Sequence, residues 1–359
     1  MEISLYIEYY ILIITLTILF SMFIDFIIGD PEIKYHPVML IGITINWLKT
    51  KLITGKSKLD KILGIILLTL VVLFFCVPIY LFQIFIWWIL NIWNLNGWQN
   101  ADLIIILIFS FIMGFILKWT FAIKNLGNAT LPIGKALESG DLEKARSDLS
   151  LIVRRNTETL DKSHIISATV ECIAESSTDA VISVFWFFMM GNLIGILIFT
   201  FLHSHIFWLF FGVPFAYLFR IINTADSIVG YKDTENINIG WFSAKMDDYS
   251  NFIPTRITSL FMLIAGKFLR KDVNNGFKNL KSYRNITESI NAGWTMSIMA
   301  GLLNVQLEKI DNYKLGFPIR PLTSKDIKIA YNIIFLTILL FILIISGITI
   351  LIIYLIFLV

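Results

Sequence analysis

Long runs of apolar residues alternate along this chain with polar segments that hold nearly all of its charged side chains. A helix needs about 20 apolar residues to cross the hydrocarbon core of a bilayer. Six runs approach or exceed that length: Ile3–Ile28, Ile62–Leu90, Leu103–Ile123, Val181–Leu202, Ile206–Ile222 and Tyr331–Val359. The pattern predicts an all-α, polytopic membrane protein with about six transmembrane helices, forming a single integral-membrane domain over residues 1–359. The fifth run is short and contains Pro214, so five or seven spans are the alternatives.

The composition of the chain agrees with a membrane protein. Of its 359 residues, 57% are hydrophobic and 15% are charged, whereas soluble domains carry about 25% charged residues. The mean hydropathy of +0.77 excludes disorder, and the chain resembles neither a coiled coil nor a secreted disulfide scaffold. The two cysteines lie far apart and suggest no zinc site. A net charge of +3 is too small to argue for a nucleic-acid partner.

The basic residues indicate which segments face the cytoplasm. All 29 Lys and Arg residues fall in three intervals, with six in Lys34–Lys61, eight in Lys118–Lys162 and fifteen in Arg220–Lys328. The connections at Asn91–Asp102 and His203–His205 hold none, and the first lies near an expected interfacial belt of Trp87, Trp88, Trp93 and Trp98. With six spans, the positive-inside rule assigns three segments to the cytoplasmic side of the cell membrane, at about 29–61, 124–180 and 223–330.

Three stretches of the polar segments have the periodicity of amphipathic helices. Asp141–Val153 reads as one such helix, with Ser139 or Asp141 as its N-cap, and Ser163–Ser176 reads as another. Lys267–Arg284 places an apolar stripe opposite six basic side chains. That third pattern favours an interfacial helix lying on anionic lipid, with phosphate binding as the alternative.

Three carboxylates form the strongest candidate for chemistry. Glu171, Glu175 and Asp179 are spaced i, i+4 and i+8, which on an α-helix places them within about 80° of one face. Like charges on one face destabilise a helix unless a cation or a positive substrate group lies there. Mg²⁺ is the natural ligand to expect, because it prefers carboxylate oxygens. A solvated acidic face is the alternative.

Two further polar clusters follow the fifth apolar run. Asn223 to Ser227 stand at its cytoplasmic end, where an acidic group is functional by default or simply caps a helix. Asp247 and Asp248 lie close to Lys245, Asn251 and Arg256 in the sequence, as a site or a structural ion-pair network would.

The remaining candidates are Arg154-Arg155, suited to phosphate or to lipid headgroups, and His36 in a Gly29-Asp30-Pro31 turn. A lone histidine is more often structural than catalytic. No GxxxxGK, GxGxxG, GxSxG or HExxH motif occurs, so a nucleotide would not bind in a P-loop.

Several of these residues together resemble the integral-membrane cobinamide-phosphate synthases of cobalamin biosynthesis, the CbiB/CobD type, from about Asp25 to Gly316. The opening element GDP…HPV…G matches at Gly29, Asp30, Pro31, His36, Pro37, Val38 and Gly42. Two elements before the fourth apolar run match at Ala145, Arg146, Leu149, Ile152, Val153, Arg155 and Thr157, and at Val170, Glu171, Ala174, Glu175 and Asp179. The most specific element matches at Asn223, Thr224, Asp226, Ser227, Val229, Gly230, Tyr231 and Lys232. It is followed by Gly240, Ser243, Ala244, Lys245, Asp247, Asp248, Asn251, Ile253, Pro254 and Arg256, and later by Ser289, Asn291, Gly293, Trp294, Met299, Ala300 and Gly301.

Five positions depart from the family pattern, at Arg154, Asn156, Ser176, Ala180 and Ile290. Asn156 stands where the family has an aspartate, so no metal or base role is carried over to it. The other four affect backbone freedom and local hydrogen bonding, which could alter substrate preference.

The resemblance implies an ATP-dependent amide ligase that joins an amino alcohol phosphate to adenosylcobyric acid and yields adenosylcobinamide phosphate. It implies Mg²⁺ held by Glu171, Glu175 and Asp179, and ATP as co-substrate. Substrate-binding roles fall to Arg155, Asn223, Lys245, Asn251, Arg256 and Asn291. The group that accepts the amine proton would be one of Asp226, Asp247, Asp248 and His36.

Two other functions stay open, namely a corrinoid transporter and a non-catalytic membrane scaffold for other cobalamin-assembly enzymes. A transporter predicts charged residues within spans, and here only Glu8 and Asp25 are clear cases, both near span ends. It also predicts internal repeats, which the sequence does not display.

Overall fold

Helices account for nearly all of the regular structure, as expected for apolar runs that must satisfy their own backbone in lipid. The computed structural model describes residues 2–31, 33, 35–94, 101–202, 210–231 and 233–358. Trp98, the connection at 203–205 and Lys232 lie outside the described residues, as does the side chain of Trp93.

The chain divides into two compact units, each assembled from separated stretches. The first comprises Met1–Ala122, Val184–Asp247 and Ile344–Val359, and the second comprises Ile123–Ser183 and Asp248–Leu343. Helices α8 (Ser183–Leu202), α10 (Trp241–Ser250) and α14 (Lys325–Leu358) each contribute residues to both. The single domain expected from the sequence stays a prediction.

Five helical stretches are long and apolar enough to cross a membrane: Glu8–Ile28, Ser57–Leu90, Asp102–Glu138, Lys162–Phe201 and Lys325–Ile356. They correspond to five of the six predicted runs and confirm an all-α, multi-pass membrane protein. The fifth run, Ile206–Ile222, is not among them. Its helix α9 (Gly212–Val229) contains part of that run, and residues 203–209 lie outside the described part of the chain.

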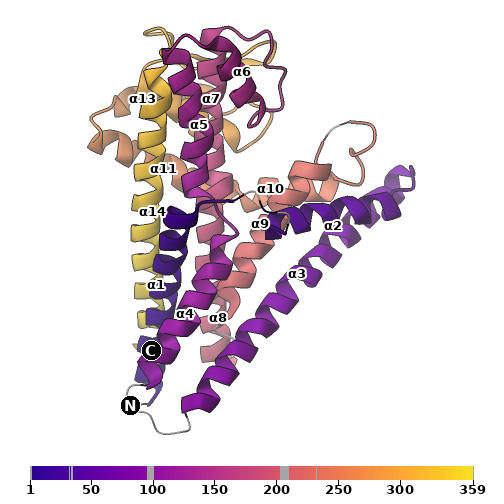
Figure 1. The fold of residues 1–359 in the computed structure, drawn as a ribbon, viewed down its shortest axis with the longest axis vertical. Coiled ribbons are helices and arrows are strands. Elements are labelled where there is room, and N and C mark those ends of the chain that lie inside the picture. Colours follow the sequence, from indigo (N-terminus) through magenta and orange to yellow (C-terminus); the bar gives the residue numbers. More distant parts are fainter. Residues whose placement is uncertain are drawn as a thin grey trace. The chain divides into compact units, whose positions relative to one another are not determined.

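In the first unit, α9 lies antiparallel along α3 (Ser57–Asn94) (Figure 1). Gln83 Nε2 donates to the carbonyl of Phe210 at 3.3 Å, and the thiol of Cys76 lies 3.5 Å from the carbonyl of Pro214. The contact residues rise in number toward α9 as they fall along α3, so the two segments run antiparallel. The contacts at Gln83 and Cys76 place the start of α9 beside the middle of the apolar run of α3. The sixth crossing stays a prediction.

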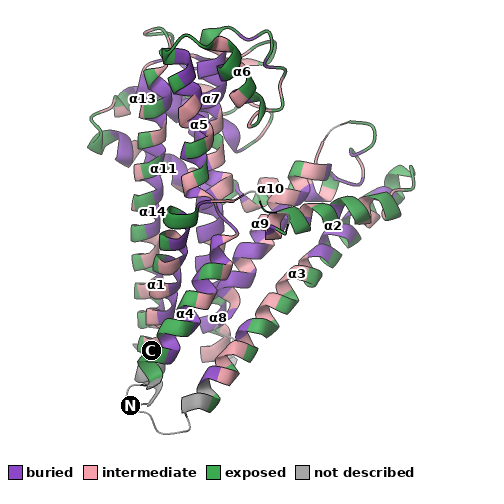
Figure 2. Ribbon diagram, viewed as in Figure 1, coloured by how far each residue is buried: buried purple, intermediate pink, exposed green. Residues whose placement is uncertain are grey.

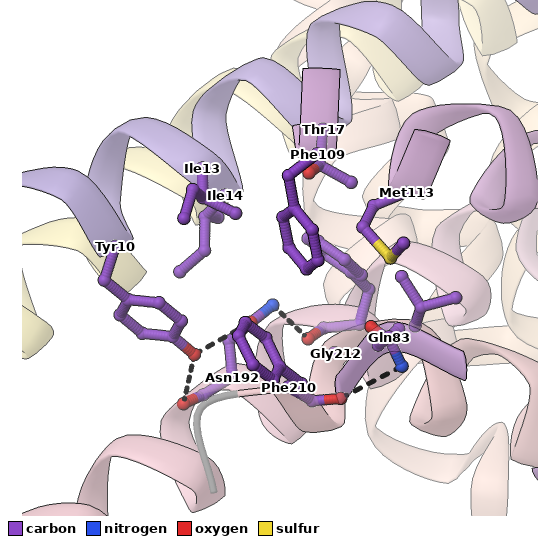
Figure 3. Close-up of a pocket in the computed structure, with 12 residues that line it drawn as sticks. Tyr10, Ile13, Ile14, Thr17, Gln83, Phe109, Met113, Asn192, Phe210 and Gly212 are labelled. Atoms are coloured by element: carbon purple, nitrogen blue, oxygen red, sulfur yellow. Dashed lines mark hydrogen bonds between the residues drawn. The ribbon is translucent and has the colours of Figure 1, made fainter. Parts of the chain in front are cut away.

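A polar clamp joins α1 (Glu2–Ile28) to α8 inside the first unit (Figure 3). The Tyr10 hydroxyl donates to Asn192 Oδ1 at 2.9 Å, and Asn192 Nδ2 donates to the carbonyl of Phe188 at 2.8 Å. Gly212 lies against the same amide, and a Cβ added there would be 2.4 Å from Asn192 Nδ2. A side chain where α9 begins would therefore displace the Asn192 amide. The first unit also contains α2 (Pro37–Leu52) and α4 (Ala101–Lys118), and α4 packs along α1.

The second unit is built around two helices that are buried along most of their length, α7 (Lys162–Ser177) and α13 (Ala292–Leu303) (Figure 2). A π-helix, η1 (Thr178–Ile182), follows α7 directly. Strands β1 (Leu307–Lys309) and β2 (Tyr313–Leu315) form a short antiparallel hairpin, with Leu307 opposite Leu315. The other helices are α5 (Ile123–Glu138), α6 (Leu142–Ser150), α11 (Phe252–Phe268), α12 (Val273–Tyr283) and the first part of α14.

Two of the three predicted amphipathic helices are confirmed and the third is wrong. Asp141 caps α6 by accepting from Lys144 N at 3.0 Å, and α7 matches the helix predicted at 163–176. The stretch Lys267–Arg284 is not one helix. The chain leaves α11 through Arg270 in the left-handed region, at φ 53°, and Asp272 then caps α12 by accepting from Asn275 N.

Candidate functional site

Charged and polar side chains from the predicted set cluster separately within each unit. In the first unit, Asp30 lies in the turn after α1 and accepts two hydrogen bonds on Oδ1. Lys118 Nζ, at the end of α4, donates at 2.8 Å, and His36 Nε2 lies 3.0 Å away. Lys118 is fully buried, and its Nζ is also 3.9 Å from Asp25 Oδ1. The turn is therefore tied to α4 by an ion pair whose lysine is buried.

Both ring nitrogens of His36 are engaged. Nδ1 accepts from the backbone N of Val38 at 3.2 Å and caps α2, so Nε2 carries the proton that faces Asp30. Burial acts to raise the pKa of Asp30, but the hydrogen bonds from His36 and Lys118 outweigh burial and hold that pKa at about 2. The geometry gives His36 a positioning role in the described structure. Its predicted role as a base stays a prediction.

The second cluster of the first unit lies between α9 and α10. Asn223 Nδ2 donates to Asp247 Oδ1 at 3.2 Å, and Asn223 Oδ1 accepts from Arg220 at 3.3 Å. Arg220 also donates to the carbonyl of Thr120 at 2.7 Å. Two predicted residues, Asn223 and Asp247, are thus in direct contact. Asp226 stands one helical turn after Asn223 on α9, and exposed Lys245 precedes Asp247 on α10.

In the second unit, Glu171 is buried within α7 and accepts three hydrogen bonds. They come from Arg155 Nη2 at 2.9 Å, Ser167 Oγ at 2.7 Å and the Tyr313 hydroxyl at 2.9 Å. Arg155 and Glu171, predicted separately for substrate and for metal, form one ion pair. The charge of Glu171 is therefore matched by a guanidinium in this structure.

The predicted carboxylate face is not continuous. Glu175 is exposed, and Asp179 falls in η1, where i to i+5 hydrogen bonds replace the α-helical spacing. Among the described residues, no three His, Cys, Asp or Glu side chains form a group that could hold a metal ion. The magnesium site stays a prediction.

Arg256 and Asn291 are brought together in the second unit. Arg256 Nη1, on α11, donates to Asn291 Oδ1 at 2.6 Å, and Asn291 Nδ2 donates to the carbonyl of Asp248 at 2.9 Å. Asn251 Oδ1 accepts from Ser183 Oγ at 2.6 Å. The predicted residues that lie around the start of α11 and the start of α13 are therefore Asp248, Asn251, Arg256 and Asn291. Arg256 is the cation among them.

Sequence reasoning missed several residues that these clusters depend on, among them Lys118, Tyr313 and Ser167. Lys118 had a usable signal, since an ionisable residue at the end of an apolar run is expected to have a partner. Tyr313 and Ser167 had none, because only the hairpin and the packing of α7 bring them to Glu171.

The fold defines an all-α, multi-pass membrane protein that carries these polar clusters. Residues 18–334 match the family model described as CobD/Cbib protein, and the chain belongs to that family. A relative from Methanothermobacter thermautotrophicus, named probable cobalamin biosynthesis protein CobD, is 32% identical over 92% of this chain and 96% of its own. Cobalamin biosynthesis protein CobD of Dehalococcoides mccartyi is 31% identical over 88% and 90%. The protein of that name in Clostridium perfringens is 31% identical over 87% of each chain. No solved structure matches the chain.

Proposed function

We propose that this protein catalyses the ATP-dependent ligation of an amino alcohol phosphate, such as aminopropanol phosphate, to adenosylcobyric acid. The product is adenosylcobinamide phosphate. The observation that carries the proposal is the match to a cobalamin-biosynthesis family over residues 18–334. The clustering of family-pattern residues into guanidinium, amide and carboxylate sets within each unit supports it.

The chemistry requires an activated carboxylate, because a free carboxylate is a poor acyl donor at neutral pH. In the proposed sequence, a propionate oxygen attacks the γ-phosphorus of ATP, which forms an acyl phosphate and releases ADP. The amine nitrogen then attacks the acyl carbon, inorganic phosphate leaves and the amine proton passes to a protein base. Asp226, Asp247 and Asp248 are the candidates for that base, with His36 as the fourth.

We further propose that the polar segments face the cytoplasm at the cell membrane. The supporting observation is that all basic residues fall in the three intervals assigned to that side. Adenosylcobyric acid would then reach the protein from the cytoplasm, and other cobalamin-assembly enzymes could dock there.

Reconstituted protein in lipid vesicles, supplied with adenosylcobyric acid, aminopropanol phosphate, ATP and Mg²⁺, tests the proposal. Mass spectrometry should detect the amide product only when all components are present, and omission of Mg²⁺ tests its requirement directly. Asp226→Asn and Asp247→Asn should each lower turnover at least 10-fold. Glu235→Gln is the matched control, because Glu235 is exposed and pairs with Lys49 alone in the described residues.

Three results would count against ligation. Retained turnover in both aspartate variants would remove those carboxylates from the mechanism. Folded wild-type protein that makes no amide with any amino alcohol phosphate would favour the scaffold. Corrinoid accumulation in the vesicles without product would favour the transporter.

A further inference from the structure

Two arginines of the second unit share one tryptophan ring. The guanidinium carbon of Arg256 lies 4.6 Å from the ring centroid of Trp294, and that of Arg284 lies 5.1 Å from the same centroid. All three side chains are partly exposed, so a solute can reach them. Within the described residues, neither guanidinium has a carboxylate at ion-pair distance.

The segment from Ser289 to Trp294 builds this arrangement. Ser289 Oγ accepts from the backbone N of Asn291 at 3.2 Å, which fixes the turn before α13. Asn291 then holds Arg256 through Oδ1 at 2.6 Å, and the carbonyl of Ile290 accepts from Arg256 Nη2 at 3.2 Å. These contacts leave Arg256 oriented, but they supply no negative charge.

Gly293 brings Arg284 to the same place. A Cβ added at Gly293 would lie 2.3 Å from the carbonyl oxygen of Arg284, so only glycine permits this approach of the end of α12 to the start of α13. The approach sets the Arg284 side chain beside Trp294, the next residue along. The family pattern had marked Gly293 and Trp294 without giving either a role, and it had not marked Arg284.

Both guanidiniums lie near the Trp294 ring, and their like charges repel each other. Burial lowers the pKa of Arg256, and the positive charge of Arg284 lowers it further. Such a pair is stabilised when an anion neutralises both guanidiniums, and planar guanidiniums match the oxygens of a phosphate with paired hydrogen bonds. A phosphate dianion satisfies the charge of the pair better than a single carboxylate does.

We propose that Arg256, Arg284 and Trp294 form the subsite that binds the phosphate group of the amino alcohol phosphate. This inference rests on the proposed function and assigns one of its substrates to a place. A phosphate monoester needs only the two cations, whereas a nucleoside triphosphate normally brings Mg²⁺, which keeps one or two carboxylate ligands. No carboxylate stands within ion-pair distance of these arginines in the described residues, which favours the monoester.

Direct binding tests the subsite without requiring turnover. Equilibrium dialysis of labelled aminopropanol phosphate against purified protein in detergent should give a Kd that rises at least 10-fold in Arg284→Ala. Arg284→Lys should lie between, since lysine keeps the charge and loses the forked geometry. Lys281→Ala is the matched control, because it also removes one positive charge near the end of α12. The wild-type Lys281 amine lies over the ring of Phe277, so this variant should change the Kd less than 2-fold.

Competition identifies the source of the phosphate. Inorganic phosphate should displace the label, unphosphorylated aminopropanol should not, and Arg284→Ala should lose that discrimination while keeping the wild-type melting temperature. An unchanged Kd in Arg284→Ala overturns the proposal, as does an equal loss in Lys281→Ala. Displacement only by ATP, or only by phosphatidylglycerol vesicles, also overturns it, because the site would then belong to a nucleotide or to lipid. Arg284-dependent binding without any amide product would support the subsite and refute the ligase. Amide formation with a Kd that does not depend on Arg284 would support the ligase and refute the subsite.

Discussion

The hydroxyl of Tyr313 and the carboxylate of Glu171 are joined by a 2.9 Å hydrogen bond to Oε2, the same oxygen that accepts from Arg155 at 2.9 Å. Burial raises the pKa of Tyr313, and the negative charge of Glu171 raises it further, so the phenol stays a donor at any physiological pH. The contact connects β2 to α7 through a buried charge. Loss of this hydrogen bond should therefore lower the stability of the fold more than it lowers turnover.

Glu171→Gln should lower the free energy of unfolding by about 3 kcal/mol, because it leaves the Arg155 guanidinium without its counter-charge. One nitrogen of that guanidinium, Nη1, is already buried with no hydrogen-bond partner in the described residues. Thermal unfolding in detergent measures the effect. Glu175→Gln is the control, since Glu175 is exposed and its loss should change the melting temperature little.

The same pair of variants separates a structural role from metal binding. Wild-type stability in Glu171→Gln, together with lost turnover that excess Mg²⁺ restores, would contradict the structural role and support the magnesium site.

Asp30→Asn should destabilise the protein at neutral pH by about 2 kcal/mol, and the difference should shrink as the pH falls from about 4 to about 2. The folded pKa of Asp30, about 2, lies below its ordinary value. Its ionised form therefore stabilises the fold above that ordinary value, and protonation removes the stabilisation on the acid side. Melting temperatures of the two proteins across this range measure the gap. A gap that does not depend on pH would show that Asp30 acts through packing instead.

His36→Ala should lower the free energy of unfolding by about 1 kcal/mol more than His36→Asn does. Asparagine can still accept from the backbone N of Val38 and cap α2, whereas alanine cannot. Differential scanning of both variants measures this. Turnover gives an independent readout. A 100-fold loss in both variants at equal stability would identify His36 as the proton acceptor.

Gly212→Ala should destabilise the first unit by about 2 kcal/mol through its clash with the Asn192 amide. Asn192→Ala alone also destabilises, because it removes the amide oxygen that accepts from the Tyr10 hydroxyl at 2.9 Å. The double variant should therefore cost less than the sum of the two single variants, which unfolding in a double-mutant cycle would reveal. Gly347→Ala is the control, since nothing lies within 4 Å of a Cβ there. Strict additivity would disprove the contact.

The sequence predicted those features of the fold that depend on local pattern. Apolar length located five spans, and the spacing of Leu149 and its neighbours, with Asp141 as the cap, located α6. The break at Arg270 was missed, because a charged residue with positive φ carries no sequence signal, although Asp272 before Val273 was a readable cap.

The candidate site was harder to predict because its partners come from distant segments. The i, i+4, i+8 rule assumes an unbroken α-helix, and η1 interrupts that helix just before Asp179. Arg155 and Glu171 were assigned separate ligands, since nothing in their spacing indicates that they bind each other. The resemblance identified Arg256 and Asn291, but only the fold places Arg284 beside them.

The burial of Lys118 affects how the topology of this protein can be mapped. Amine-reactive reagents that do not cross membranes are used to report which lysines face each side. The Lys118 amine is enclosed and bound to Asp30, so it will not react in the folded protein, whichever side the reagent is on. Its labelling would instead report opening of the turn between α1 and α2. The sidedness of this part of the chain should therefore be measured at Lys51 or Lys58, whose side chains are exposed.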